Sequence, residues 1–273
     1  MNVIKKSAHG ICFSFFILVV ISFPVVEAFP SGLSDPPTFT YSDGEWYDSW
    51  GVTRTWANGP DGFIPLLSSE TLGKNKDLAY AIGERFRDTY SNNITMVDAI
   101  LSYVQRLTEY GYDEDNVYMN DEAQIEWAWN ADEMAQGMDE SQGIVVVGDC
   151  EDMAFLCLTI YSAAGIETAI IDAPSHCALL IWMPEYPNAN IYWELSEEDR
   201  GPGWIWIEAT GEENPVGWTP SEFNDGYWTA YTIKDGFYVE QYPTEDYSED
   251  EFFSTIFEII IIIISIVTKI FFT

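Results

Sequence analysis

The side chain best suited to covalent chemistry is Cys150, which lies in the segment Gly148-Asp149-Cys150-Glu151-Asp152. It opens a stretch to Ala164 that is apolar on most sides and is followed by Gly165, a pattern typical of a buried helix. The N-terminus of a helix stabilises a thiolate through its free N–H groups and its dipole, whereas the flanking carboxylates oppose it. Cys150 is therefore a candidate nucleophile. The alternative is a buried free cysteine that packs as a small apolar residue.

Two further cysteines bear on whether that thiol is free. Cys157 lies in the same predicted helix, about 10 Å further along its axis, which is too far for a disulfide with Cys150. Cys177 follows His176 in a predicted strand, so the two side chains point to opposite faces. If His176 faces the helix, Cys177 faces away from it, and Cys150 is expected to stay free.

A general base and an orienting acid are found downstream. The chain has two histidines, and His176 is the one outside the N-terminal segment. Glu208 ends a predicted strand whose neighbouring residues are apolar, and a buried carboxylate needs a partner. His176 is its natural partner, and an imidazolium beside Cys150 would favour the thiolate. Asp172 and Glu194, which also lie near strand ends, are the competing acids.

Three segments carry a resemblance to a known family: GDCEDMAFLCLTIYSAAGI, SHCALLIW and WIWIEATGEENPVGW. They resemble the transglutaminase-like superfamily of papain-type cysteine enzymes over about residues 80–220, and the GDCED form is closest to its prokaryotic transglutaminase-like proteases. The resemblance implies a nucleophilic cysteine at the start of a central helix, with histidine and acid on successive strands of an antiparallel sheet. Matched by position, the triad is Cys150, His176 and Glu208. Many members carry aspartate as the third residue, so the glutamate is a departure that lengthens the reach of the acid.

Such a mechanism also needs donors for the oxyanion that forms on the substrate. The backbone N–H of Cys150 would supply half of the oxyanion hole. The candidates for the second donor are the side chains of Gln124, Trp127 and Trp129, although each tryptophan taken singly is more often a core residue.

The charge of the chain limits its partners and cofactors. The sequence has 11 Lys and Arg against 45 Asp and Glu, a net charge of −34. Nucleic acid is therefore not an expected partner, because phosphate binding needs a basic surface. Asp149, Glu151 and Asp152 offer the clustered carboxylates that Ca²⁺ prefers, although a solvated acidic turn is the commoner explanation of such a run. No other cofactor is expected.

Periodicity predicts the elements that hold these residues. Apolar residues recur with helical spacing over 77–90 and 94–110. Beyond residue 166 the pattern predicts strands at 167–172, 175–183, 191–195, 203–209, 227–233 and 237–241. Helices followed by strands indicate the α+β class with an antiparallel sheet. The resemblance refines this to a papain/transglutaminase-like core, with the central helix packed on the sheet.

The two ends are expected to lie outside the fold. Residues 1–28 read as a secretory signal peptide with a basic start, an apolar run and a cleavage site after Ala28; the alternative is an uncleaved anchor helix. The apolar residues 252–272 would span about 30 Å as a helix and predict a transmembrane anchor; the alternative is a buried strand. Between these ends we expect an irregular lead-in at 29–76, the transglutaminase-like domain at 77–242 and an acidic stalk at 243–251.

Together these features predict a membrane-anchored extracellular thiol hydrolase, a cysteine peptidase that cleaves a protein or peptide through an acyl-enzyme. It would cross the cell membrane once through the C-terminal helix, with its catalytic domain outside. Two alternatives stay open. One is a protein-glutamine acyltransferase (a transglutaminase), in which an amine instead of water resolves the same acyl-enzyme. The other is a non-catalytic extracellular binding module of the same fold.

Overall fold

The apolar segment that begins at Cys150 forms the central helix of the fold. A computed structural model of the chain describes residues 33, 37–196, 198–211 and 213–244. Helix α6 (Cys150–Ala163) is buried along nearly its whole length. Around it pack α1 (Phe63–Leu72), α2 (Leu78–Thr89), α3 (Asn93–Leu107) and α5 (Ala131–Gly137). A helix that is apolar on most sides needs apolar partners on most sides, and these four helices supply them. The predicted buried helix is confirmed.

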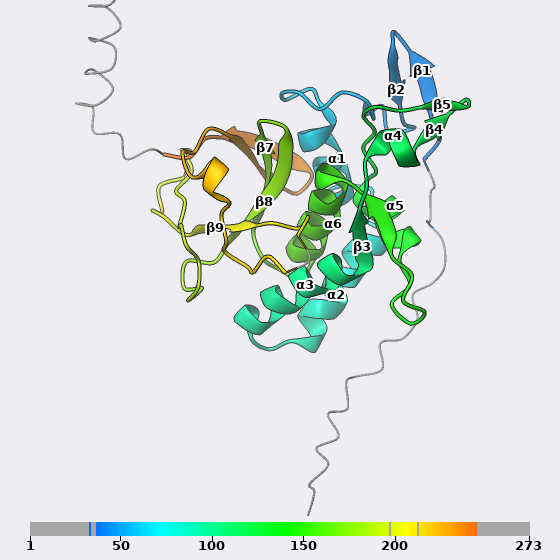
Figure 1. Cartoon of the computed structure of the whole chain (residues 1–273). Helices are drawn as coiled ribbons and strands as arrows, with labels where there is room; N and C mark the ends of the chain where they lie inside the picture. The colour runs from blue at the N-terminus through cyan, green and yellow to red at the C-terminus, as the bar shows by residue number, and fades with distance from the viewer. Residues whose placement is uncertain (1–32, 34–36, 197, 212, 245–273) are drawn as a thin grey trace, which may run out of the picture. The chain divides into compact units, whose positions relative to one another are not determined.

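A five-stranded antiparallel sheet completes the core. Its strands run in the order β11 (Phe237–Gln241), β10 (Thr229–Lys234), β7 (Thr168–Ala173), β8 (His176–Trp182) and β9 (Trp204–Ile207). The inner strands β7 and β8 contact α6, so the central helix lies against the middle of the sheet (Figure 1). The chain is therefore of mixed α+β class with an antiparallel sheet, as predicted.

The turn between β7 and β8 sets the position of His176. Pro174 and Ser175 alone connect the two strands, and Ala173 pairs with His176 across the turn. Ser175 has a φ of 57°, a left-handed conformation that turns of this length need and that glycine adopts more easily. His176 is therefore the first residue of β8, at the end of the sheet where its side chain can reach a neighbouring element.

Short elements connect these layers. β1 (Thr40–Ser42) and β2 (Glu45–Tyr47) form a hairpin, as do β4 (Tyr118–Met119) and β5 (Glu122–Ala123), which follow the one-turn helix α4 (Asp113–Asn116). β3 (Thr108–Tyr110) pairs in parallel with β6 (Val146–Gly148), and β6 leads directly to α6. A single 3-10 turn, η1 (Ser221–Phe223), lies between β9 and β10 in the chain.

Two expectations differ from the structure. The described part of segment 29–76, expected to be irregular, contains the hairpin β1–β2 and helix α1. Because α1 is buried on most of its surface, with Phe63 against Phe155 of α6, it lacks the polar face that makes a helical period visible in sequence. The strand expected at 191–195 is a loop with isolated bridges from Trp193 and Leu195. These bridges lead to two different segments, so no continuous ladder forms.

The predicted signal peptide at 1–28 and the predicted anchor at 252–272 lie outside the described residues, as does most of the predicted stalk at 243–251. Within the part of the chain that the structure describes, no helix combines the length and the apolar character that crossing a bilayer requires.

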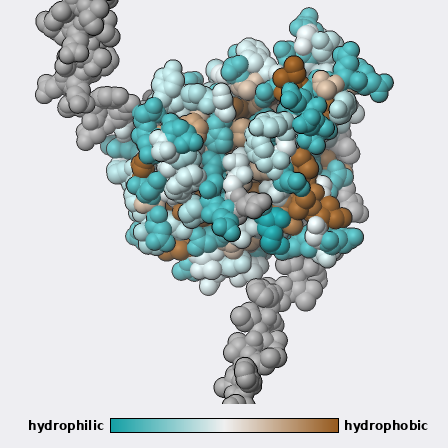
Figure 2. Space-filling view, viewed as in Figure 1, coloured by the Kyte–Doolittle hydropathy of each residue, from teal (hydrophilic) through white to brown (hydrophobic). Residues whose placement is uncertain are grey.

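Polar residues dominate the face of the molecule that Figure 2 draws. Apolar side chains gather mainly on the side of this face where α5 lies.

Candidate active site

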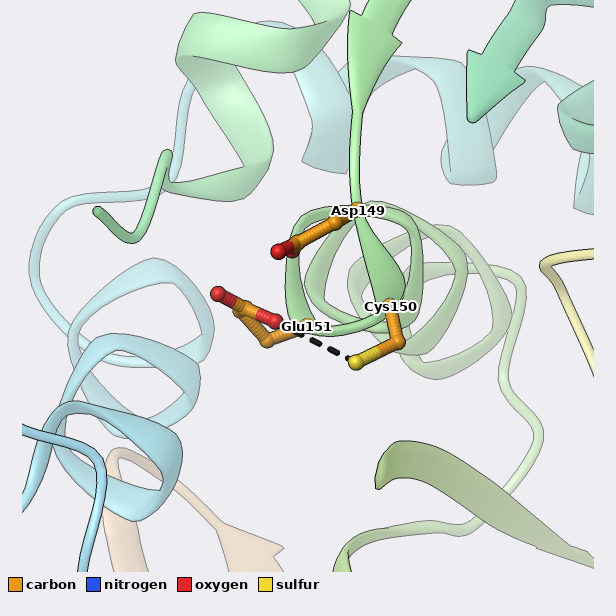
Figure 3. A group of neighbouring side chains, drawn as sticks. All are labelled: Asp149, Cys150 and Glu151. Carbon is orange, nitrogen blue, oxygen red and sulfur yellow. Dashed lines mark hydrogen bonds between the residues drawn. The ribbon is translucent and has the colours of Figure 1, made fainter. Parts of the chain in front are cut away.

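Cys150 is the first residue of α6, and the preceding strand β6 packs closely against the first turn of that helix. A Cβ atom at Gly148, the last residue of β6, would lie 2.7 Å from Asp152 Oδ2 and 2.9 Å from Asp152 Cβ, so a larger residue there would displace Asp152. The N–H of Asp149 donates to the same Oδ2 over 3.3 Å, which is half of a capping box at the helix start. The half-buried thiol of Cys150 donates to Glu151 Oε2 over 3.3 Å (Figure 3).

His176 is held between a carboxylate and an aromatic ring. Its Nε2 atom lies 2.8 Å from Glu208 Oε2, and its side chain is 18% exposed. The imidazole stacks on Phe223 of η1, with ring centroids 5.2 Å apart and planes 8° apart. Phe223 in turn stacks on Trp206 of β9 at 5.3 Å. Bonding at Nε2 leaves Nδ1 as the ring nitrogen that can meet the Cys150 sulfur.

Glu208 follows β9 and is fully bonded although it is buried. Its Oε1 accepts hydrogen bonds from the hydroxyl of Thr210 (2.5 Å) and from the Thr210 N–H (3.2 Å). Its Oε2 accepts from the Trp206 indole N–H (3.4 Å) as well as facing His176. Burial acts to raise the pKa of Glu208, but the hydrogen bond and charge of His176 together with the Thr210 bonds hold that pKa below its usual range. Glu208 is therefore a carboxylate at neutral pH.

The electrostatics of the imidazole tie the three residues together. Burial acts to lower the pKa of His176, but its interactions with Cys150 and Glu208 raise that pKa to about 10. His176 is therefore an imidazolium at neutral pH, with a sulfur on one side and a carboxylate on the other. The structure therefore brings the predicted trio together: His176 is hydrogen-bonded to Glu208, and Cys150 lies close enough to the imidazole to raise its pKa.

The competing acids lie elsewhere. Asp172 belongs to β7, where it pairs with Cys177, and burial raises its pKa. Glu194 lies in the loop before β9, and its backbone carbonyl accepts from the N–H of Thr244 over 2.8 Å. The carboxylate hydrogen-bonded to His176 is that of Glu208.

Cys150, Cys157 and Cys177 form no disulfide; Cys157 and Cys177 are buried, whereas Cys150 is half-buried. Burial raises the pKa of both buried thiols. The alternation of His176 and Cys177 is as expected, but the faces are exchanged. His176 shares its face of β8 with Ala178 and Leu180, which pack in the tryptophan-rich cluster of β9, and this leaves the face toward α6 to Cys177. His176 reaches Cys150 because it stands at the very end of the strand.

The candidate oxyanion donors occupy three different environments. Trp127 is fully buried among other aromatic rings, with its indole N–H enclosed. Trp129 is half-buried, and its backbone N–H donates to Asp152 Oδ1 over 2.7 Å, which ties it to the start of α6. The Gln124 amide donates to the carbonyl of Glu122 over 2.9 Å, within the β4–β5 hairpin. The donor role of these three residues stays a prediction.

Of the acidic residues around Cys150, Glu151 and Asp152 are buried and Asp149 is half-buried, so this run is not a fully solvated turn. Glu151 and Asp152 are 4% and 0% exposed, and Asp113 of α4 joins them. Carboxylate oxygens of Asp113, Asp149 and Asp152 lie within 4.8 Å of one another. Burial is the largest cause that raises the pKa of each of these carboxyl groups, that of Asp113 to about 7. An all-oxygen set of this kind fits a hard cation such as Ca²⁺, which would neutralise it as protons do.

The roles of three residues that support the site were not predicted from the sequence. Thr210 bonds the Glu208 carboxylate, and the Gln105 amide of α3 donates to the carbonyls of Glu208 (3.2 Å) and Asn214 (2.9 Å). Phe223 stacks on His176. Thr210 stands two residues after Glu208, so its proximity was a usable signal. Gln105 and Phe223 come from distant segments and leave no local trace.

Comparison of the chain with protein-family models, with curated proteins and with solved structures found no match. The chemistry of the site therefore rests on its own geometry.

Proposed function

We propose that this chain is a thiol hydrolase that cleaves amide bonds in a protein or peptide, with Cys150 as nucleophile, His176 as acid and base, and Glu208 as the orienting acid. The observation that carries the proposal is the half-buried imidazole of His176, which is hydrogen-bonded to the Glu208 carboxylate at 2.8 Å and has its pKa raised by Cys150 and Glu208. A thiolate–imidazolium pair oriented by a third group is the arrangement that activates a cysteine for acyl transfer. This is the reaction that the transglutaminase-like resemblance also implies.

In the first half of the reaction, the Cys150 thiolate adds to the substrate carbonyl carbon, and the carbonyl electron pair moves to oxygen. The N–H of Cys150 at the start of α6 donates to that oxyanion. When the oxyanion collapses, the C–N bond breaks and the His176 imidazolium gives its proton to the departing nitrogen. The products are a thioester on Cys150 and a neutral amine.

In the second half, the now neutral His176 takes a proton from water as the water oxygen adds to the thioester. Collapse of this second intermediate releases the carboxylic acid and returns the thiolate beside an imidazolium. Glu208 holds Nε2 throughout, so that Nδ1 serves both proton transfers. The Thr210 and Trp206 bonds keep the carboxylate in place while the charge on the ring changes.

The location of the reaction is part of the proposal and rests on the sequence of the two ends. A signal peptide at 1–28 and an anchor at 252–272 would leave the catalytic domain on the outer side of the cell membrane. Protease added to intact cells would then remove the domain. Recovery of the full-length protein without detergent would contradict the anchor.

The reaction is tested by incubating the full-length protein with a peptide library, with and without a primary amine, and identifying products by mass spectrometry. We expect cleaved peptides, a thioester adduct on Cys150, and loss of both in Cys150→Ala. Cys177→Ala, which removes a buried thiol, is the matched control and should retain turnover. Products joined to the amine would identify an acyltransferase. An unchanged cleavage rate in Cys150→Ala would contradict the assignment of the nucleophile.

A further inference from the structure

A pocket of about 360 Å³ opens directly beside the imidazole of His176. Besides His176 and Glu208, its lining comes from the β7–β8 turn, the segment after β9, and η1. Its lining includes Pro174, Asn214, Trp218, Pro220, Glu222 and Phe223. This volume lies at the lower end of the range for small-molecule sites, so it suits one extended side chain.

The walls of this pocket combine apolar surface with uncompensated negative charge. Trp218 is 38% exposed, and Pro174, Pro220 and Phe223 add further apolar surface. Glu208 is neutralised by His176, but the exposed Glu222 has only the hydroxyl of Ser221 as its hydrogen-bond partner among the described residues. None of the residues that line the pocket is a lysine or an arginine. The charge of an occupant should therefore be positive.

The pocket lies on the leaving-group side of the bond that would be cleaved. If His176 delivers the proton to the departing nitrogen, the part of the substrate that carries this nitrogen must lie next to the imidazole. The pocket shares His176 and Phe223 with the site, so it lies on this leaving-group side. Side chains close to the new amino terminus are the ones that can enter it.

We propose that this pocket binds the cationic side chain of a lysine or arginine in one of the first two residues on the leaving-group side of the cleaved bond. The proposal rests on the proposed function for its orientation, because that function defines the leaving group. The ammonium or guanidinium group pairs with Glu222. The indole face of Trp218 attracts the cation and covers the methylene groups that precede it.

The first test compares matched peptides that carry lysine, norleucine or glutamate at those two positions. We expect kcat/KM to be about 10-fold higher for lysine than for norleucine, and lower still for glutamate. Glu222→Gln should reduce the lysine-to-norleucine ratio at least threefold. Glu185→Gln, an exposed glutamate in the loop after β8, should leave it unchanged. Equal rates for the lysine and norleucine peptides would overturn the proposal.

A second test does not depend on catalysis. The full-length Cys150→Ala protein is titrated with N-acetyl-lysine methylamide or its norleucine counterpart, and ¹⁹F NMR follows the Trp218 signal of fluorotryptophan-labelled protein. We expect the lysine compound to bind at least threefold more tightly, and this preference to disappear in Glu222→Gln but not in Glu185→Gln. Binding without peptide cleavage by the wild type would refute the thiol hydrolase and keep the cation pocket. Cleavage without this preference would do the reverse.

Discussion

At the scale of single residues, the candidate site depends on how one imidazole is held. His176 stands between a sulfur and a carboxylate, and each favours its protonated form. Glu208 can do this from a buried position only because Thr210 and Trp206 satisfy its remaining lone pairs. The acid is therefore the residue whose replacement tests the arrangement most directly.

Replacing Glu208 by glutamine should lower kcat by about 10–10³-fold with little change in KM, because the amide can hydrogen-bond the ring but cannot stabilise its positive charge. Steady-state kinetics with a cleaved peptide measures this. Asp172→Asn and Glu194→Gln are the matched controls, because neither carboxylate is the one bonded to His176. If one of these controls loses activity while Glu208→Gln retains it, the third member of the triad is a different residue.

The three described cysteines should react with iodoacetamide at very different rates. Cys150 is half-buried and faces an imidazolium, whereas Cys157 and Cys177 are buried and burial raises the pKa of their thiols. Peptide mapping of the native protein after brief labelling should find Cys150 modified first, by at least 10-fold. Labelling of Cys177 ahead of Cys150 would contradict the faces assigned to β8.

At the scale of elements, the site is a meeting point of four segments. The start of α6 supplies Cys150, the first residue of β8 is His176, Glu208 directly follows β9, and η1 supplies the ring that stacks on the imidazole. The stack continues from Phe223 to Trp206, so η1 connects the imidazole to the sheet. A change in η1 should therefore have a measurable effect on the rate of the reaction.

Phe223→Leu should lower kcat by about 10-fold, because the imidazole loses the planar surface that limits its rotation. The same change should shift the His176 titration followed by NMR, which a merely structural role would not. Phe223→Tyr keeps the ring and should restore both values. Phe237→Leu, at a residue of β11 that is 77% exposed, is the control and should change neither. A normal titration in an inactive Phe223→Leu would refute a positioning role.

At the scale of the whole molecule, buried groups that prefer to hold protons make stability depend on pH. Burial is the main cause that raises the pKa of Asp132 to about 7, although its carboxylate accepts from the N–H of Ala79 at the start of α2. His176, at about 10, binds its proton up to a higher pH than an unfolded histidine does. Glu208 behaves in the opposite way: because its pKa is lowered, its contribution to the free energy of unfolding is lost only at acidic pH.

The free energy of unfolding should therefore fall as pH rises. Between about pH 4 and 7 the folded state holds a proton on Asp132 that the unfolded state has lost, and His176 acts likewise between about pH 6.5 and 10. Urea titrations at pH 5, 7 and 9 should show this loss. In Asp132→Asn the decline between pH 5 and 7 should shrink by on the order of 2 kcal/mol. A decline of the same size in the variant would show that Asp132 is ionised in the folded state.

Much of this architecture could be read from local patterns in the chain. The apolar runs of α6, β7 and β8 and the alternating segment of β9 predicted the α+β class, and their ends predicted where Cys150, His176 and Glu208 would stand. Periodicity is a property of neighbouring residues, so the sequence alone determined these elements. Helix α1 was not predicted, because it is buried on most sides and its sequence has little helical periodicity.

Other features depend on contacts between residues far apart in the chain, and only the tertiary structure decided them. Asp113 joins the carboxyl groups at the start of α6 from a separate helix, and Phe223 reaches His176 from η1. The faces taken by His176 and Cys177 depended on which side of the sheet α6 would cover. No local pattern encodes these meetings, because packing brings the partners together only when the helices and the sheet close around α6.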